Sequence, residues 1–198
     1  MLAKLQWEPL FDVIGNRLPN RFIRHDPTHR ERYLQEIAEL ATGLGERDAF
    51  VLFPEGHNFT PEIRGRAIAH LRRGGHLREA LKAERMRRVL PPRLGGAEAA
   101  IAAAPEADVV FAAHTLLEDI PSIANVWSDV PLPRPVSARY WRVSSSEIPR
   151  GKDGQVDWLF AWWGEIDRWI DDRRAQVDHE QLARPVAHDA ADPQGGDP

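Results

Sequence analysis

The chain has 198 residues, which is enough for one domain with a proper core, and its 42% hydrophobic and 28% charged residues are typical of a soluble globular protein. No apolar stretch approaches the ~20 residues that span a bilayer, and the first residues lack the apolar core of a signal peptide. The lack of cysteine excludes disulfides, thiol catalysis and cysteine-bound metals, and it fits a cytosolic setting.

The net charge of -4 is unevenly distributed along the chain. Between Glu62 and Arg93, ten Lys/Arg stand against three Glu, so this stretch carries +7 and the remainder -11. We therefore expect one face of the protein to suit anions.

The first elements predict a helix between two strands. Residues 2–17 form a broken helical segment around Pro9, and their abrupt start suggests that the chain enters in the middle of a fold. Residues 18–26 contain a short strand, and Thr28 with Glu31 forms a capping box that opens a helix. That helix is expected to stop at Gly43.

Residues 49–53 are an apolar run that Pro54 stops, with Glu55 and Gly56 at the exit. This pattern predicts a buried strand that ends in a loop where a ligand can approach the backbone, the usual place for a site in an α/β sheet. The order strand, helix, strand favours a parallel pair with a right-handed crossover. A core strand stopped by proline, with a stray glutamate, is the alternative.

The later elements are predicted from periodicity, glycines and prolines. They are helices at 62–73 and 76–88, a rigid turn at 89–96, a helix at 97–104, strands at 107–113 and 136–144, a helix at 156–173 and a disordered tail from Gln176. The arginines of the two basic helices suit the phosphates of a nucleotide-bearing cosubstrate or an anionic membrane surface, and solvated helix faces are the alternative. No nucleic-acid motif is present, so DNA and RNA are not expected partners.

Trp158, Trp162 and Trp169 share one face of the helix at 156–173. Tryptophans can lie at a membrane interface, but neighbouring acids such as Asp171 would be repelled by anionic lipid. We expect these tryptophans to pack in the core.

Three stretches resemble one family. Phe53-Pro54-Glu55-Gly56 resembles the third conserved block of the glycerolipid acyltransferases of the 1-acylglycerol-3-phosphate acyltransferase type, and Phe59-Thr60 resembles the eukaryotic-type branch. Residues 90–96 resemble the fourth block, and Ile148-Pro149 with the tryptophan helix resembles the end of that domain. The resemblance implies an α/β domain over residues 1–175, with a central mixed or parallel sheet flanked by helices. It would be truncated at its N-terminus and followed by a disordered tail at 176–198.

The activity that the resemblance implies is transfer of an acyl chain from acyl-CoA to the free hydroxyl of a lysophospholipid. Lysophosphatidate is the first acceptor that we expect. Acyl-CoA would be a cosubstrate, with no other cofactor and no metal. Pro54, Glu55 and Gly56 would shape the acceptor site, and Arg24 and Arg93 would meet its phosphate, although the block around Arg24 departs from the family pattern Gly-x-x-x-Ile-Asp-Arg. The membrane would be met peripherally at its cytoplasmic face, or through a missing upstream segment.

The catalytic base of that family lies in a His-x4-Asp block upstream of every stretch matched here, so its expected place falls before Met1. One such spacing exists, His114 with Asp119, but it follows Phe-Pro-Glu-Gly instead of preceding it, and Pro121 would cut short a helix holding Asp119. His57 stands where the family has threonine. The alternative function is therefore a domain that binds lipid or acyl-CoA without turning it over.

Overall fold

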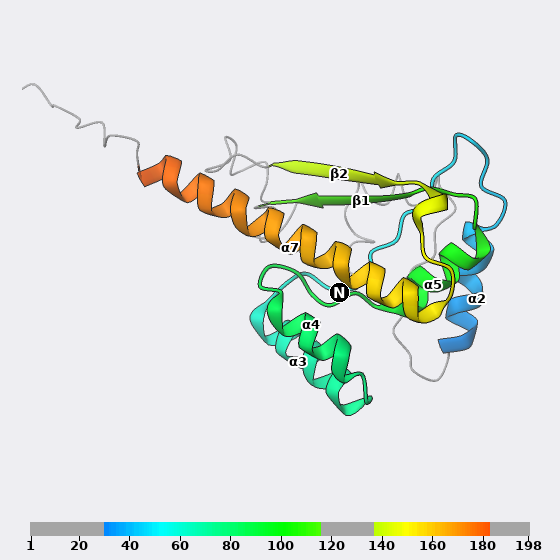
Figure 1. Cartoon of the computed structure of the whole chain (residues 1–198), viewed down its shortest axis with the longest axis horizontal. Coiled ribbons are helices and arrows are strands. Elements are labelled where there is room, and N and C mark those ends of the chain that lie inside the picture. Colours follow the sequence, from blue (N-terminus) through cyan, green and yellow to red (C-terminus); the bar gives the residue numbers. More distant parts are fainter. Residues whose placement is uncertain (1–29, 116–136, 183–198) are drawn as a thin grey trace, which may run out of the picture.

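The computed structural model describes residues 30–115 and 137–182. Its elements are α2 (Arg30–Ala41), α3 (Pro61–Arg73), α4 (Leu77–Arg85), α5 (Leu94–Ala103), β1 (Val109–His114), β2 (Ala138–Val143), the short 3-10 helix η3 (Ser145–Glu147) and α7 (Lys152–Leu182). The long helix α7 runs beneath the two strands, with α3 and α4 on its other side and α2 and α5 near its start (Figure 1).

The protein is mixed α/β, as predicted, but the described residues contain no parallel pair of the expected mixed or parallel central sheet. β1 and β2 pair antiparallel, from Val109 opposite Val143 to His114 opposite Ala138. They form a sheet of two strands, and no described segment adds a third. β1 and β2 form where strands were predicted, at residues 107–113 and 136–144.

The predicted buried strand at residues 49–53 does not form. Within the described part of the chain the segment joins no sheet, and Val51 and Phe53 are 70% and 81% exposed. Only Leu52, between them, packs against the core. An apolar run of five residues is compatible with a buried strand, but it also suits an extended segment that buries only every second side chain.

Aromatic side chains join the sheet to α7. Phe111 of β1 stacks on Trp162 at 4.9 Å between ring centroids and meets Trp163 edge-on at 6.0 Å. Trp141 of β2 contacts Trp162 and Trp169 edge-on. Offset and edge-on contacts are the favourable arrangements for aromatic rings. The tryptophans of α7 therefore pack in the core, as we expected from the acids beside them.

A close approach of α2 to α5 depends on the glycines at the start of α5. A Cβ on Gly96 would lie 3.1 Å from Cδ1 of Ile37 and 3.4 Å from the hydroxyl oxygen of Tyr33. The helix begins at Leu94, so Gly95 and Gly96 belong to its first turn and not to the loop predicted for residues 89–96. Glycine is needed here because the two helices approach too closely for a side chain.

The α3–α4 hairpin has local signals at each of its ends. Thr60 caps α3 by accepting a hydrogen bond from the Ile63 N–H at 3.2 Å, and Pro61 occupies the first turn. Gly75, with φ of 80°, makes the turn between the helices. Arg64 donates hydrogen bonds to the carbonyl oxygens of Met86 (2.7 Å) and Glu84 (2.8 Å), at the C-terminal end of α4. The helix ends at Arg85, three residues before the predicted end at residue 88.

Asp167 fixes the loop that follows α4. Its buried carboxylate accepts hydrogen bonds from the backbone N–H groups of Arg87 and Arg88, at 2.8 and 2.6 Å, while Asp171 pairs with the Arg88 side chain. Hydrogen bonds to an ionised group are among the strongest in proteins. One turn of α7 thus holds the segment between α4 and the candidate site.

α7 is longer than predicted, because it begins at Lys152 and continues to Leu182, beyond Gln176, where we expected order to end. Residues 183–198 lie outside the described residues. So do the segments predicted at 2–17 and 18–26 and the capping residue Thr28. Among the helices that are described, none is long and apolar enough to cross a membrane.

Asp108 is expected to make the sheet sensitive to acid. Hydrogen bonds from the Ser145 N–H (2.9 Å) and the Arg142 side chain (2.7 Å) hold the pKa of this carboxyl below its usual value of 3.8. A depressed pKa contributes stability that is present above the usual value and is lost as the pH falls through the lower, folded-state pKa. Urea denaturation at several pH values should show Asp108→Asn less stable than the wild type near neutrality, with the difference shrinking below about pH 4.

Asp172→Asn is the control for this prediction. Asp172 is exposed and makes no side-chain hydrogen bond or ion pair within the described part of the chain. Equal pH profiles for the two variants would contradict the role given to Asp108.

Candidate functional site

The Phe-Pro-Glu-Gly motif folds into a tight turn. The Gly56 N–H donates to the carbonyl oxygen of Phe53 at 3.1 Å, and Gly56 adopts a φ of 67°. Only glycine takes this left-handed conformation without strain. The turn therefore has a local reason for its last residue, independent of any resemblance.

Arg93, in the second motif (residues 90–96), contacts this turn directly. The backbone N–H of Arg93 donates to the carbonyl oxygen of Pro54 at 2.9 Å. A Cβ on Gly56 would lie 3.0 Å from the guanidinium carbon of Arg93, so the arginine side chain lies against the bare face of the glycine. The two stretches predicted to form one site, although well apart in the sequence, are thus in contact.

His57 also belongs to this cluster. Its Nδ1 lies 3.1 Å from Nη2 of Arg93. A guanidinium is always a donor, so Nδ1 accepts and its lone pair is occupied in this contact. His57 is exposed, and its ring contacts Arg93.

Tyr33 of α2 is a member of the cluster that sequence reasoning missed. Its hydroxyl stands at the close approach of α2 to Gly96, and burial raises the pKa of its phenol, an effect that the charge of Arg93 offsets only in part. Tyr33, Ile37 and Ala41 follow one another at four-residue spacing on α2, and the latter two are buried. That helical spacing was the signal available for placing Tyr33 on the packed face.

Exposed apolar side chains adjoin the cluster. Phe53 is the first residue of the turn, Val51 lies two residues before it, and both side chains are exposed. A cation beside exposed apolar side chains is the combination that suits an amphiphilic anion.

The remaining predicted residues differ in what the structure says of them. Arg24 and Asp119 lie outside the described residues. His114 is exposed at the end of β1 that points away from α5, whereas Arg93 lies at the start of α5 (Figure 1). Glu55 lies in the turn beside Gly56 and is half-buried.

Many of the basic side chains predicted to meet phosphates or membrane are engaged within the protein. Arg64 binds backbone carbonyl oxygens, Arg72 pairs with Glu84, and Arg88 pairs with Asp171. Arg78 and Lys82 share the carboxylate of Asp157, at 3.1 and 2.6 Å. These five cations serve the fold, in part or wholly, so the sequence count of positive charge overstates what is available to a ligand.

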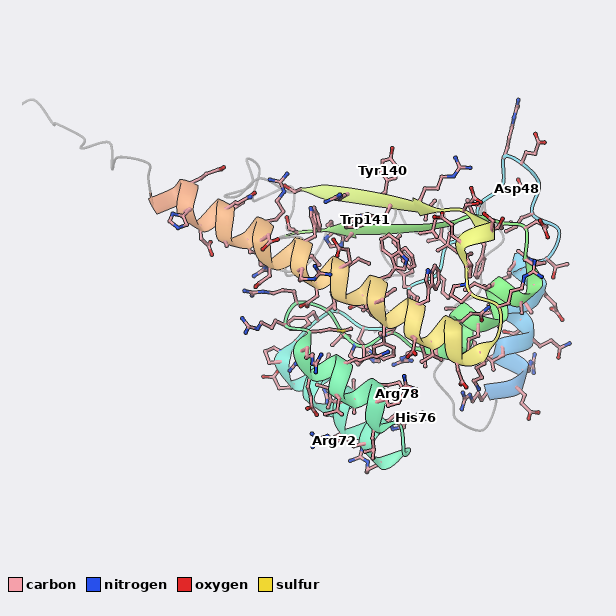
Figure 2. The ribbon with its side chains drawn as sticks, in the orientation of Figure 1. Asp48, Arg72, His76, Arg78, Tyr140 and Trp141 are labelled. Atoms are coloured by element: carbon pink, nitrogen blue, oxygen red, sulfur yellow. The ribbon has the colours of Figure 1, made fainter. Side chains whose placement is uncertain are left out.

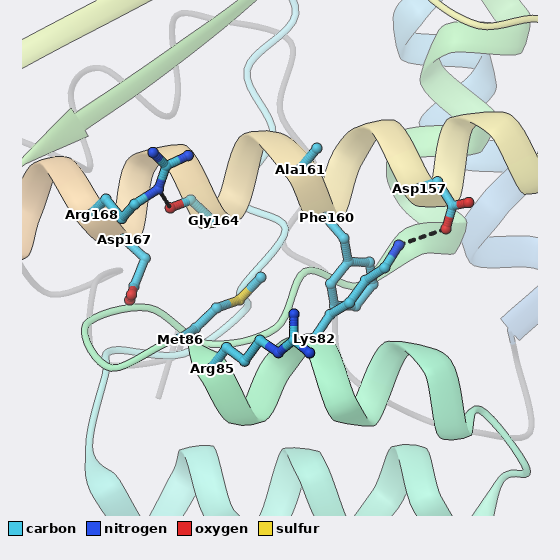
Figure 3. A pocket seen from close by; sticks show the side chains of 9 residues that line it. All are labelled: Lys82, Arg85, Met86, Asp157, Phe160, Ala161, Gly164, Asp167 and Arg168. Atoms are coloured by element: carbon cyan, nitrogen blue, oxygen red, sulfur yellow. Dashed lines mark hydrogen bonds and ion pairs between the residues drawn. The ribbon is translucent and has the colours of Figure 1, made fainter.

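A separate hollow of about 310 Å³ lies between α4 and α7, with Met86 and Phe160 on its apolar side and Lys82, Arg85 and Arg168 among its polar side chains (Figure 3). None of the predicted site residues lines this hollow. Within the described residues no three metal-ligating side chains gather anywhere, so the candidate site rests on a guanidinium, an imidazole and a phenol.

Gly56→Ala is expected to disturb both the turn and Arg93. Alanine would pay roughly 1–2 kcal/mol for the left-handed backbone, and its Cβ would displace the guanidinium from a 3.0 Å contact. We expect lower stability in urea denaturation and a shifted Nε resonance of Arg93 in NMR spectra.

Gly43→Ala is the matched control, because Gly43 has a similar φ of 74° but nothing within 4 Å of an added Cβ. It should lose similar stability and leave the Arg93 resonance in place. If both variants move that resonance equally, or neither does, the close contact is contradicted.

No family model, no curated protein and no solved structure matches this chain. The candidate site therefore stands on its own geometry and on the resemblance of its two motifs.

Proposed function

We propose that this chain is a glycerolipid acyltransferase domain that moves an acyl chain from acyl-CoA to a lysophospholipid such as 1-acylglycerol-3-phosphate. The observation that carries the proposal is the contact of Arg93 with the Pro54–Gly56 turn, through the 2.9 Å backbone hydrogen bond and the guanidinium against Gly56. Both motifs that resemble the family contribute to one cluster, as a shared acceptor site requires.

The chemistry of the cluster suits the head of such an acceptor. A guanidinium binds phosphate through paired N–H donors, and the missing side chain of Gly56 leaves room for that guanidinium beside the turn. Glu55 would orient a cation or a backbone group, because a carboxylate repels phosphate.

The exposed side chains of Val51 and Phe53 suit the apolar part of the same ligand. A lysophospholipid carries an anionic head and an acyl chain, so a site for it needs a cation and apolar surface side by side. The proposal includes a peripheral position at the cytoplasmic face of the membrane, where such lipids are met, and the finer fold of the acyltransferase family.

A second candidate is binding of lysolipid or acyl-CoA without turnover. It is favoured by the state of the histidines in the described residues, because His57 uses Nδ1 to accept from Arg93 and His114 lies at the far end of β1. The acyl transfer proposed for the family type needs a base that takes the proton of the attacking hydroxyl.

The test is to incubate the purified chain with oleoyl-CoA and lysophosphatidate and to follow free CoA with a thiol reagent and the lipid product by mass spectrometry. The acyltransferase proposal predicts CoA release that depends on lysophosphatidate, with phosphatidate formed in equal amount. Binding of lysophosphatidate without CoA release would favour the second candidate. No binding and no release would reject both.

A further inference from the structure

The outward face of α4 carries two exposed leucines. Leu77 and Leu81 are 62% and 58% exposed, and their spacing of four residues places them one above the other on the helix. The opposite face of α4 is packed, with Ala80 and Ala83 buried. The leucines therefore contribute little to the core and remain available to another surface.

Cations lie beside these leucines. Arg85 continues the same stripe, four residues after Leu81, and it forms no side-chain hydrogen bond or ion pair within the described part of the chain. Arg78 and Lys82 each follow one of the leucines along α4 and share the carboxylate of Asp157, at 3.1 and 2.6 Å; Figure 3 shows the pair of Lys82 with Asp157. These three cations outnumber the carboxylate of Asp157, but Glu79 of α4 and Asp167, which lines the same hollow as Lys82 and Arg85, lower the surplus.

Four further acids lie near this face, and two of them do not pair with an arginine: Glu79 lies 4.0 Å from His76, and Asp167 accepts from the backbone N–H groups of Arg87 and Arg88. Glu84 pairs with Arg72 on the side toward α3, and Glu165 pairs with Arg168 on α7. The acids near the face thus offset part of its positive charge, and the face remains part of a hairpin that is basic overall. The hairpin as a whole, residues 61–88, has nine Lys/Arg against three Glu, or +6, while the rest of the chain carries -10.

We propose that this face, formed by Leu77, Arg78, Leu81, Lys82 and Arg85 and called here the α4 face, docks on the surface of an anionic lipid bilayer. In a peripheral membrane contact, apolar side chains such as leucine insert into the membrane interface. The cations beside them contact the anionic lipid head groups. A stable protein–protein interface would bury roughly 800 Å² of this chain's surface around a packed apolar centre. Two leucines surrounded by charged side chains do not offer such a centre.

The inference rests on the proposed function for the expectation that the chain works at a membrane. Its test does not, because vesicles of phosphatidylserine and phosphatidylcholine contain neither lysophospholipid nor acyl-CoA. Failure of acyl transfer and failure of docking are therefore separate results.

The experiment is cosedimentation of the full chain with such mixed vesicles and with pure phosphatidylcholine vesicles. We expect binding to the mixed vesicles that weakens as salt is raised and is at least about tenfold weaker to the neutral ones. Leu77→Ala with Leu81→Ala should lower the partition coefficient by at least about tenfold, since apolar area is no longer inserted. Arg78→Gln with Arg85→Gln should lower it by about fivefold per arginine.

The control pair is Val110→Ala with Tyr140→Ala, two side chains of the outer face of the sheet that are 55% and 75% exposed. Figure 2 shows Tyr140 projecting away from α7, on the other side of the molecule from the hairpin. Vesicle binding of this control variant should match that of the wild type. Circular dichroism should show that all variants are folded.

Three results would overturn the proposal. They are equal binding to neutral and mixed vesicles, binding that survives the α4 variants, and binding lost equally in the control pair. Tight binding of soluble polyglutamate through the same leucines and arginines, with no binding to vesicles, would indicate an acidic protein partner and would also overturn it.

Discussion

Phe111→Ala should destabilise the protein by about 3–5 kcal/mol, the usual cost of removing a buried aromatic side chain. Phe111 is buried in β1 and contacts Trp158, Trp162 and Trp163 of α7. Alanine would leave a cavity at the point where the sheet meets the helix. Because small domains are stable by only about 5–15 kcal/mol, the change should be plain in urea denaturation followed by tryptophan fluorescence.

Two further variants make this result specific. Val110→Ala, the adjacent residue on the exposed face of β1, should cost less than about 0.5 kcal/mol. Phe111→Leu should lower the free energy of unfolding by about 1.5 kcal/mol, between the losses for Val110→Ala and Phe111→Ala. This variant can still be measured if Phe111→Ala does not fold. A loss of similar size at Val110 would contradict the placement of Phe111 between sheet and helix.

Arg93→Gln should weaken binding of lysophosphatidate by about tenfold to a hundredfold, because a hydrogen bond to a charged group is worth about 1.5–3 kcal/mol. The fold should be kept, since Arg93 is exposed and its contact with Pro54 is made by the backbone. Isothermal titration of lysophosphatidate below its critical micelle concentration measures the loss. Arg93→Lys should recover part of the affinity, because it keeps the charge but not the paired donors.

Arg73→Gln is the matched control for Arg93. Arg73 is exposed at the end of α3 and forms no side-chain hydrogen bond or ion pair among the described residues. Removing it subtracts the same charge at another place, so affinity should be nearly unchanged. If both variants lose affinity equally, the ligand responds to the overall charge and not to a site at Arg93.

The sequence predicted the helices and the two paired strands well, because each has a periodic pattern or a clear boundary. Gly75 separates α3 from α4, and the spacing of Trp158, Trp162 and Trp169 marks the packed face of α7. The run at residues 49–53 was misassigned because a strand also needs a partner, and whether a partner is present depends on the whole fold. The same dependence on distant segments made the direction of strand pairing unpredictable.

The candidate site was predicted in part. The turn at Gly56 and its arginine partner were named from the sequence, and the structure brings Pro54, Gly56 and Arg93 into contact. The Tyr33 hydroxyl was not predicted, since its place beside Arg93 follows from how α2 packs on α5. The sequence also could not distinguish cations that bind the carbonyl oxygens at the end of a helix, such as Arg64, from cations that face solvent.

The central claim is that Arg93 and the Pro54–Gly56 turn form a site for the phosphate of a lysolipid. Its most direct test compares the binding of lysophosphatidate with that of the monoacylglycerol of the same chain length, which lacks only the phosphate, to the wild-type protein. We predict saturable binding of lysophosphatidate, at least about tenfold tighter than that of the neutral lipid, with NMR shifts at Gly56 and at the Arg93 side chain. Equal affinity for the two lipids, or shifts that leave Gly56 and Arg93 unmoved, would contradict the account.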